Sequence, residues 1–488
     1  MSSQAAVAAG SPDTVAAAVA LLRRGGNAFD AAIAAGFAAA VAEPGLSSLG
    51  GGGFLLAQRA DGHQELHDFF VDAPGRGRSA AAREPHFTPV TVQFAGVGQV
   101  FYAGYGSVAV PGGLDGYLSA HRRLGRLPLA EVVAPAAALA RDGVALSATQ
   151  AAVLQLLDGI LSLTPEGRAL FLPDGRLPTT GQVLRNPQYA QTLAQIASGR
   201  IDGFATAALS DPLVAMMHAH DGLVGADDLA AYAPVVRAPL VMGYRSARIA
   251  TNPRPSFGGS IVTRALDLLG ADRPVSLAPH DVVRLAWAIV RATGEEKQRR
   301  TGPQSRLGTT HISVADAEGN VASMTTSNGS CSGVFVPGTG IQLNNVMGER
   351  DLHPEGFHVA EPGTRVASMM APTIVTGTDG SVTALGSGGS ERIRSALVQV
   401  IVALVDRSQD PATAVTTPRL HVDDHGVQIE PGFDPDVYDA LAQQWTVNEW
   451  PAQDLYFGGA HVVRRGADGQ MTATGDARRG GSAAVVDL

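Results

Sequence analysis

The chain has 488 residues, 45% of them hydrophobic and 17% charged, with a formal net charge of −9 at pH 7. This composition is too apolar and too weakly charged for a disordered protein, and the length allows one large domain or two to three smaller ones. The acidic balance provides no basic surface for nucleic acid, so we expect a small-molecule substrate.

Helical signals dominate the first half of the chain. Two alanine-rich segments, 13–23 and 28–42, predict core helices, because glycines end the first and Asn27 can cap the second. A glycine-rich turn then leads into "GFLLAQ", and "HQELHDFF" returns, which predicts a hairpin. From residue 112 to about 228 the pattern is mostly helical. Strands are expected again in "PLVMGYRSARIAT", and a further helix starts at "HDVVRLAW".

The N-terminal region predicts no membrane segment. Its longest apolar run, 31–42, is shorter than the roughly 18 residues that a transmembrane helix needs. The first 13 residues lack both a basic region and the apolar core of a signal peptide. We therefore expect no membrane partner and a cytoplasmic location.

From residue 309 onward, short strands and turns replace the helical pattern. "THISVAD" and "VASMTTS" flank the turn "AEGN" and predict a hairpin with Ile312 and Val314 on one face. Residues 371–386 predict a second hairpin, and 390–406 a long buried helix. Helices followed by strands, a helix and more strands favour a layered α+β fold with mostly antiparallel sheet.

Common catalytic motifs are missing from the sequence. The chain has no H-E-x-x-H, no G-x-x-x-x-G-K-[ST] loop and no G-x-S-x-G, and Cys331 is its one cysteine. We therefore expect no metal and no cofactor. A buried thiol is the favoured interpretation of Cys331.

The stretch "GTTHISVADAEGN" offers a different nucleophile. Gly308 can adopt a backbone conformation that brings the Thr309 hydroxyl to the preceding carbonyl. An N-to-O acyl shift and hydrolysis would then cut the chain and release the Thr309 amine. With a pKa of about 7.7–8.0, such an amine can accept the proton of its own hydroxyl. Thr310 is the competing candidate, and a threonine pair that merely begins a strand is the simpler alternative.

An acyl-transfer site also needs backbone donors for an oxyanion. Gly388 and Gly389, in "GSGGSERIRSA", stand just before a predicted helix, where backbone amides are unpaired. Spacing alone does not connect these glycines to Thr309.

The chain resembles the γ-glutamyltranspeptidase family of N-terminal nucleophile hydrolases. The resemblance rests on ordered motifs along nearly the whole chain, among them "GGNAFDAA", "EPGLSSLGGGGF", "GTTHISVADAEGN", "LNNVM", "SMMAPTIV" and "GSGGSERIRSA". It implies a four-layer αββα sandwich of two subunits, 1–308 and 309–488, cut from one precursor and associated as a heterodimer, with further oligomerisation left open. It also implies an acyl-enzyme on Thr309, an oxyanion held by Gly388 and Gly389, and a Ser327 hydroxyl that orients the nucleophile.

The substrate-binding motifs depart from the family pattern. Members that act on glutathione have an arginine where this chain has Phe70, in "DFFVDAP", and that arginine grips the α-carboxylate of the γ-glutamyl group. The serine pair that shares this carboxylate corresponds to Ala367 and Ser368. The resemblance further assigns Asn345 and Glu349 to substrate binding, with Glu349 facing the α-amine. The basic residues that could replace the missing arginine are Arg76, Arg350 and Arg365.

These features predict a self-processing threonine hydrolase or acyltransferase with altered γ-glutamyl recognition. One alternative is a carbon–carbon bond hydrolase of the same family, acting on a keto acid in secondary metabolism of the alkylproline type. The other is a processed binding protein without catalysis.

Overall fold

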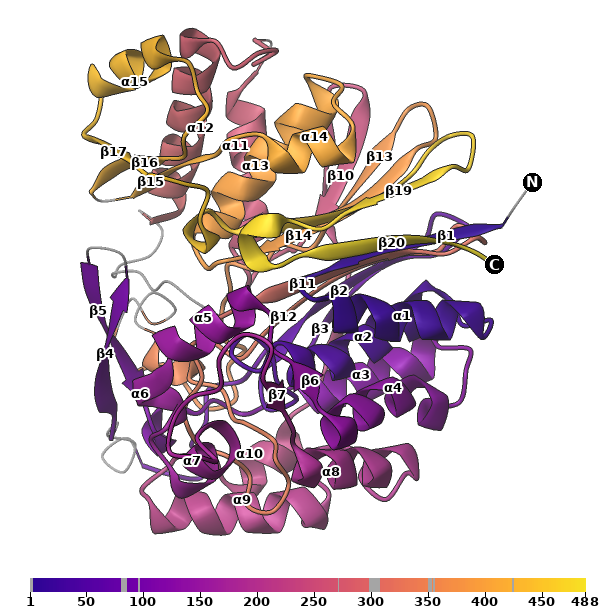
Figure 1. Ribbon diagram of the computed structural model, residues 1–488, viewed down its shortest axis with the longest axis vertical. Coiled ribbons are helices and arrows are strands. Elements are labelled where there is room, and N and C mark those ends of the chain that lie inside the picture. The colour runs from indigo at the N-terminus through magenta and orange to yellow at the C-terminus, as the bar shows by residue number, and fades with distance from the viewer. Residues whose placement is uncertain are drawn as a thin grey trace.

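The computed structural model describes residues 3–79, 86–94, 97–270, 272–297, 308–349, 353, 356–423 and 425–488. Two antiparallel sheets lie face to face between two layers of helices (Figure 1). This arrangement confirms the predicted four-layer αββα sandwich.

The first sheet has seven strands, all antiparallel to their neighbours. Their order is β20 (Ser482–Asp487), β1 (Gln4–Ala9), β11 (Thr310–Ala315), β12 (Val321–Ser327), β2 (Gly52–Gln58), β3 (Gln64–Asp68) and β8 (Val235–Arg237). The predicted hairpins β2–β3 and β11–β12 are both present. Ile312 and Val314 share one face and belong to the core beneath the helices, as predicted.

The second sheet has six antiparallel strands. Their order is β19 (Met471–Thr474), β18 (Gly459–Arg465), β14 (Val382–Gly388), β13 (Thr373–Gly377), β10 (Ala247–Thr251) and β9 (Leu240–Tyr244). The predicted hairpin of residues 371–386 corresponds to β13 and β14. Strand β11 of the first sheet lies against β14 and β18 of the second.

Helices cover the outer face of each sheet. Those on the first sheet include α1 (Pro12–Arg23), α2 (Ala28–Ala42) and α3 (Gly113–Leu124), with α4 (Leu129–Asp142) packed on α2 and α8 (Pro187–Ala197) packed on α4. Those on the second include α11 (Gly258–Leu268), α13 (Arg392–Val405) and α14 (Pro411–Thr416), with α12 (Pro279–Lys297) packed on α11 and α13. Helix α2 begins at its predicted residue because Asn27 accepts from the amides of Phe29 and Asp30, and Asp30 accepts in return from the Asn27 amide.

Smaller elements surround the sandwich. They are β4 (Thr88–Phe94), β5 (Val97–Ala103), β6 (Val144–Ala145), α5 (Ala148–Leu156), α6 (Asp158–Leu161), α7 (Pro165–Phe171), β7 (Val183–Leu184), α9 (Ala207–Ala219), α10 (Ala226–Ala231), β15 (Leu420–Asp423), β16 (Gly426–Ile429), α15 (Pro435–Ala442) and β17 (Val447–Glu449). Short 3-10 turns are η2 (Tyr105–Ser107), η3 (Val346–Gly348), η5 (Leu455–Phe457) and η6 (Ala477–Arg479). No helix in the described part of the chain is long and apolar enough to cross a bilayer.

Both halves of the chain contribute strands to both sheets. In the first sheet, β11 pairs with β1, and β12 pairs with β2. In the second, β13 pairs with β10. Segments 1–308 and 309–488 are therefore not separate folding units, and a cut between them would leave two fragments joined by two continuous sheets.

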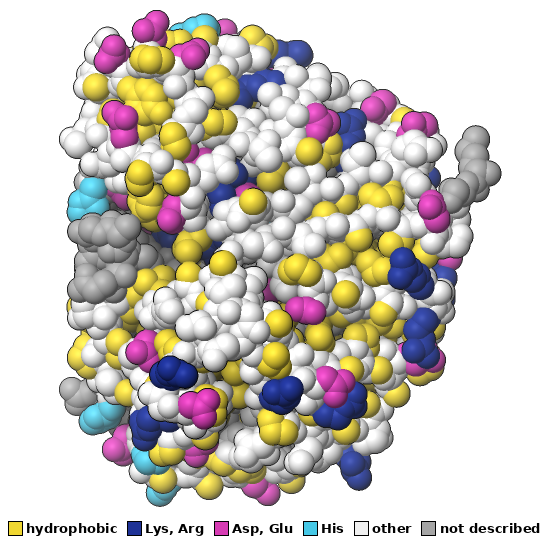
Figure 2. Space-filling model, in the orientation of Figure 1, with side chains coloured by type: hydrophobic (Ala, Val, Ile, Leu, Met, Phe, Trp, Pro, Cys, Tyr) yellow, Lys and Arg dark blue, Asp and Glu magenta, His cyan; other side chains and the backbone are white. Residues whose placement is uncertain are grey.

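Charged side chains are scattered over the surface. On the face drawn in Figure 2, dark blue Lys and Arg alternate with magenta Asp and Glu, and the part that is not grey shows no continuous basic patch.

Candidate active site

The candidate nucleophile lies at the start of the central hairpin. Thr309 directly precedes β11, and Ser327 is the last residue of β12. The Thr309 hydroxyl donates to the Ser327 hydroxyl over 3.2 Å. Ser327 in turn donates to the carbonyl oxygen of Gly308 and accepts from the amide of Gly329. One hydroxyl thus connects the candidate nucleophile to the carbonyl that precedes it.

Gly308 lies where there is no room for a side chain. Its φ of +81° lies in the left-handed region. A Cβ built there would overlap the carbonyl oxygen of Gly329. Both the backbone angle and the close approach therefore require glycine at this position.

Asn345 and Glu349 bind the backbone of the loop that follows β12. Their side-chain oxygens both accept from the amide of Ser330, at 2.6 and 3.0 Å respectively. A Cβ on Gly329 would overlap the Asn345 amide oxygen and lie 2.6 Å from Glu349 Oε1. The fold thus brings these two predicted substrate-binding residues to the loop that follows β12, directly after Ser327.

The glycine pair lies against the candidate nucleophile. Gly388 ends β14, and α13 begins at Arg392. A Cβ on Gly388 would overlap the carbonyl oxygen of Thr309, and Gly389 has a φ of +114°. The predicted oxyanion segment is therefore beside Thr309, although the two are far apart in sequence.

Phe70 contacts core and strand residues, and Ser368 bonds within its own loop. The Phe70 ring is 2% exposed and stacks on Phe54 at a centroid distance of 5.7 Å. The backbone of Phe70 is close to Gly52, because a Cβ built on Gly52 would lie 3.0 Å from the Phe70 Cα. Gly52 in β2 is the strand partner of Ser327 in β12. The Ser368 hydroxyl accepts from the Met370 amide, within its own loop. Phe70 is thus one strand away from Ser327, with its ring in an apolar core.

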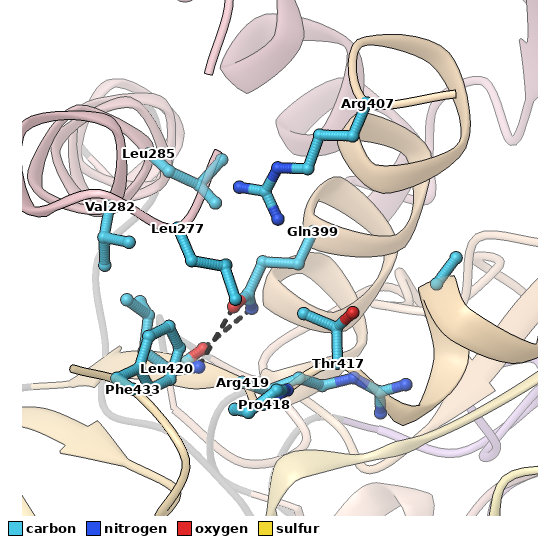
Figure 3. A pocket seen from close by; sticks show the side chains of 11 residues that line it. Leu277, Val282, Leu285, Gln399, Arg407, Thr417, Pro418, Arg419, Leu420 and Phe433 are labelled. Atoms are coloured by element: carbon cyan, nitrogen blue, oxygen red, sulfur yellow. Dashed lines mark hydrogen bonds between the residues drawn. The ribbon is translucent and has the colours of Figure 1, made fainter. Parts of the chain in front are cut away.

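A cavity elsewhere in the molecule is too small for a substrate. It lies among α12, α13 and β15, with Leu285, Gln399 and Arg407 in its wall (Figure 3). The space open to a water-sized molecule is about 10 Å³, which is room for a single water. Among the described residues, no three His, Cys, Asp or Glu side chains are grouped as metal ligands would be.

Comparison with known proteins identifies the family. The γ-glutamyltranspeptidase family model matches residues 14–278 and 290–486. The chain belongs to the γ-glutamyltranspeptidase family. It is accordingly an enzyme, an N-terminal nucleophile hydrolase of the hydrolase and acyltransferase type.

Relatives within this family differ in their named activities. The chain is 32% identical to the acylase ACY 1 proenzyme of Pseudomonas sp. (strain SE83), over 97% of this chain and 92% of that protein. It is 27% identical to the glutathione hydrolase proenzyme of Escherichia coli, over 94% and 87%. The crystal structure of cephalosporin acylase from Bacillus halodurans superimposes with a TM-score of 0.85 at 25% identity, over 99% and 96%.

The basic residues considered as replacements for the missing γ-glutamyltranspeptidase arginine have different environments. Arg365 is committed to ion pairs with Asp68 and Asp72, at 2.9 and 2.7 Å. The Arg76 side chain is exposed, and its backbone amide donates to Asp228. Arg350 lies outside the described residues. Of these three arginines, Arg76 is the one that the structure shows with an exposed side chain.

A buried charge cluster that the sequence analysis does not predict supports the second sheet. Arg419 pairs with Asp476 at 2.7 Å, and Arg478 pairs with Glu430 at 2.6 Å. Burial alone would raise the pKa of Asp476, but Arg419 and Arg478 outweigh that effect and hold this pKa below its usual range. A single sequence gives no signal for such pairs, because the partners lie in different elements.

His461 in β18 adjoins this cluster and should make stability depend on pH. Burial lowers the pKa of His461 to about 4. An unfolded histidine binds its proton near pH 6.5, so the unfolded state holds more protons between about pH 6.5 and 4. We expect the free energy of unfolding to fall across that window as the pH is lowered, by up to about 3 kcal/mol from this residue.

Urea unfolding measured from pH 7 to 4 tests this expectation. Burial also lowers the pKa of His311, so the His461→Gln variant should lose part of the pH slope and keep the rest. His63→Gln, which changes a histidine that is 59% exposed, should keep the full slope. Equal slopes in the wild type and the His461 variant would contradict the assignment.

Proposed function

We propose that the chain cuts itself between Gly308 and Thr309 and then acts as a threonine acylase. The observation that carries this proposal is the hydroxyl chain from Thr309 through Ser327 to the Gly308 carbonyl in the uncut protein. The same serine hydroxyl can receive the proton of the nucleophile and polarise the carbonyl that the nucleophile attacks. The geometry therefore supports attack by Thr309 before any amine is free.

The cut proceeds in two steps, an acyl shift and a hydrolysis. The Thr309 hydroxyl oxygen attacks the Gly308 carbonyl carbon, and the C–N bond between the two residues breaks. The Thr309 nitrogen takes the proton of the hydroxyl group, which leaves an ester between Gly308 and the Thr309 oxygen. Water then hydrolyses the ester. Its hydroxyl group gives the carboxylic acid of Gly308, which passes its proton to the new Thr309 amine, and the other proton of the water restores the Thr309 hydroxyl. The products are segments 1–308 and 309–488, which the shared sheets hold together as a heterodimer.

The released amine supplies the general base for turnover. It accepts the proton of the Thr309 hydroxyl as the oxygen attacks an acyl donor, while Ser327 orients that hydroxyl. We assign the amides at Gly388 and Gly389 to the oxyanion, since this segment lies against Thr309 and precedes α13. Water or an amine acceptor then takes the acyl group.

The acyl donor is proposed to be less anionic than a γ-glutamyl group. Phe70 stands where the resemblance expects an arginine, and Arg365 is neutralised by two aspartates. Asn345, Glu349 and Ser368 remain as the assigned polar contacts. Loss of a charge-assisted hydrogen bond costs about 1.5–3 kcal/mol, or roughly 10- to 150-fold in binding. Acylases among the relatives support such a shift.

A series of three p-nitroanilides tests the donor. The γ-glutamyl compound carries an α-amine and a carboxylate, the glutaryl compound only the carboxylate, and the pentanoyl compound neither. We expect kcat/KM for the pentanoyl donor to exceed that for the γ-glutamyl donor by about tenfold or more. The reverse order of kcat/KM values would contradict the proposal that γ-glutamyl recognition is altered. It would not affect the assignment of Thr309 as the nucleophile.

The same assay separates the two alternatives. Cleavage of a vinylogous keto acid without turnover of any anilide would favour the carbon–carbon hydrolase. If the wild type and Thr309→Ala give equal rates with every donor, catalysis by Thr309 is contradicted and the binding-protein alternative is favoured.

A further inference from the structure

A buried arginine lies against the carbonyl group of the candidate nucleophile. Arg479 is the last residue of η6 and is 4% exposed. Its Nη1 donates to the carbonyl oxygen of Thr309 at 3.4 Å, and its Nε donates to the carbonyl of Leu455 at 3.2 Å. The guanidinium is therefore held in place through two of its three nitrogens.

Three glycines make room for this side chain. A Cβ on Gly459 would lie 2.7 Å from the Arg479 Cδ. A Cβ on Gly388 would lie 3.3 Å from Nη1, and one on Gly389 would lie 3.1 Å from Nη2. The arginine thus passes over Gly459 and ends beside the segment assigned to the oxyanion. Side chains at these positions would crowd the guanidinium or displace it.

One donor group of the arginine remains unused. Nη2 is buried and has no hydrogen-bond partner among the described residues. A buried donor without a partner destabilises the fold, and such groups are uncommon in native proteins. An unused charged donor beside Gly389, next to the nucleophile, is better explained by the chemistry of the site than by stability.

The charge of Arg479 persists at neutral pH. Burial, followed by the nearby Arg392, lowers the pKa of Arg479 to about 10. Asp454, Asp476 and Glu43 act in the opposite direction. The Glu43 carboxyl is held by the hydroxyls of Thr310 and Thr14, at 2.6 and 2.8 Å, and burial raises its pKa.

Other titratable groups face the same region. His311 follows Thr310 on β11, and burial lowers its pKa well below the usual value. His461 on β18 is likewise held neutral, and Glu349 accepts from the Ser330 amide. The titratable groups that act on Arg479 are therefore Arg392, Asp454, Asp476 and Glu43, and Glu349, His311 and His461 lie on the elements beside Thr309.

Arg479 is a cation in direct contact with residue 309. The amine and the carbonyl oxygen of one residue are about 3 Å apart, so the Arg479 Nη1 lies within about 7 Å of the amine that a cut would release. A positive charge at that range disfavours a second positive charge on the amine.

We propose that Arg479 is a positioning residue that fixes the Thr309 carbonyl and keeps the released Thr309 amine unprotonated near neutral pH. The proposal rests on the proposed cut before Thr309. An amine with its ordinary pKa of about 7.7–8.0 would be mostly protonated at pH 7, and a lower pKa leaves more of it available as a base.

The test compares amine reactivity in the wild type, Arg479→Met, Arg479→Gln and Arg479→Lys. Each protein is pulsed with acetic anhydride at pH 5 to 9, and the acetylated N-terminal peptide of each fragment is quantified by mass spectrometry. The amine of the first fragment is an internal reference. Arg464→Met, which removes a part-exposed arginine on β18, is the matched control.

We expect the midpoint for the Thr309 amine to rise by about one pH unit in the Met and Gln variants. The reference amine and the Arg464 control should not move, and Lys should restore part of the shift. The acid limb of kcat/KM for the best anilide should move by the same amount, leaving the alkaline plateau within about twofold.

The outcomes separate the two proposals. An uncut wild type overturns the proposed function and this inference with it. Cut variants whose amine midpoint equals that of the wild type overturn this inference alone, as does an equal loss of rate at every pH. If the Met variant does not fold, the Gln variant is decisive.

Discussion

Thr309→Ala is expected to leave one uncut chain and to lower kcat/KM by at least about 10³-fold. The substitution removes the hydroxyl that donates to Ser327 and, by preventing the cut, also removes the free amine. Nucleophile and base are then lost together, which is why the effect should be this large. Denaturing electrophoresis and the anilide assay measure the two consequences separately.

Thr310→Ala is the matched control for this prediction. The Thr310 hydroxyl donates to the Glu43 carboxyl at 2.6 Å and not to Ser327. Its loss should lower the free energy of unfolding by about 1–3 kcal/mol, because a buried carboxyl oxygen loses a donor. The cut should still occur. An uncut Thr310 variant beside a cut Thr309 variant would reverse the assignment of the nucleophile.

Gly308→Ala is expected to prevent the cut and to destabilise the uncut chain by at least about 3 kcal/mol. The new methyl group would overlap the Gly329 carbonyl oxygen at a φ that disfavours alanine. The scissile carbonyl would then have to move away from Ser327. Electrophoresis reports the cut, and denaturant unfolding in a Thr309→Ala background reports the stability without interference from processing.

Gly62→Ala separates backbone strain from the close approach. Gly62 has a φ of +85°, close to that of Gly308, but a methyl group at this position would meet no atom within 4 Å. We expect this variant to lose about 1 kcal/mol and to be cut normally. Normal cutting of Gly308→Ala would show that the tight contact with Gly329 is not needed.

Local signals are sufficient to predict many of the elements. Helix α2 has the predicted bounds because Asn27 forms the expected cap. Strands β1 and β20 are not predicted, although β1 lies between β20 and β11 in the first sheet. Their sequences, "QAAVAA" and "SAAVVD", show no alternation of polar and apolar residues, because β1 is almost fully buried and β20 is partly buried along its length.

The site depends on long-range information. Thr309 and Ser327 belong to one predicted hairpin, but Gly388, Asn345 and Glu349 are connected to them by family resemblance and not by spacing. Arg479 and Glu43 escape prediction, because a charged residue in a single sequence is expected on the surface. The substrate roles of Phe70 and Ser368, the cytoplasmic location and a place in secondary metabolism stay predictions.

The mass of the smaller fragment of purified wild-type protein tests the central claim most directly. Intact mass spectrometry, with N-terminal sequencing of the same sample, should give a chain that begins Thr-Thr-His and ends at Leu488. A catalytically active preparation in which residues 308 and 309 remain joined, or in which the new terminus is any other residue, would contradict a nucleophile that is created by its own cleavage.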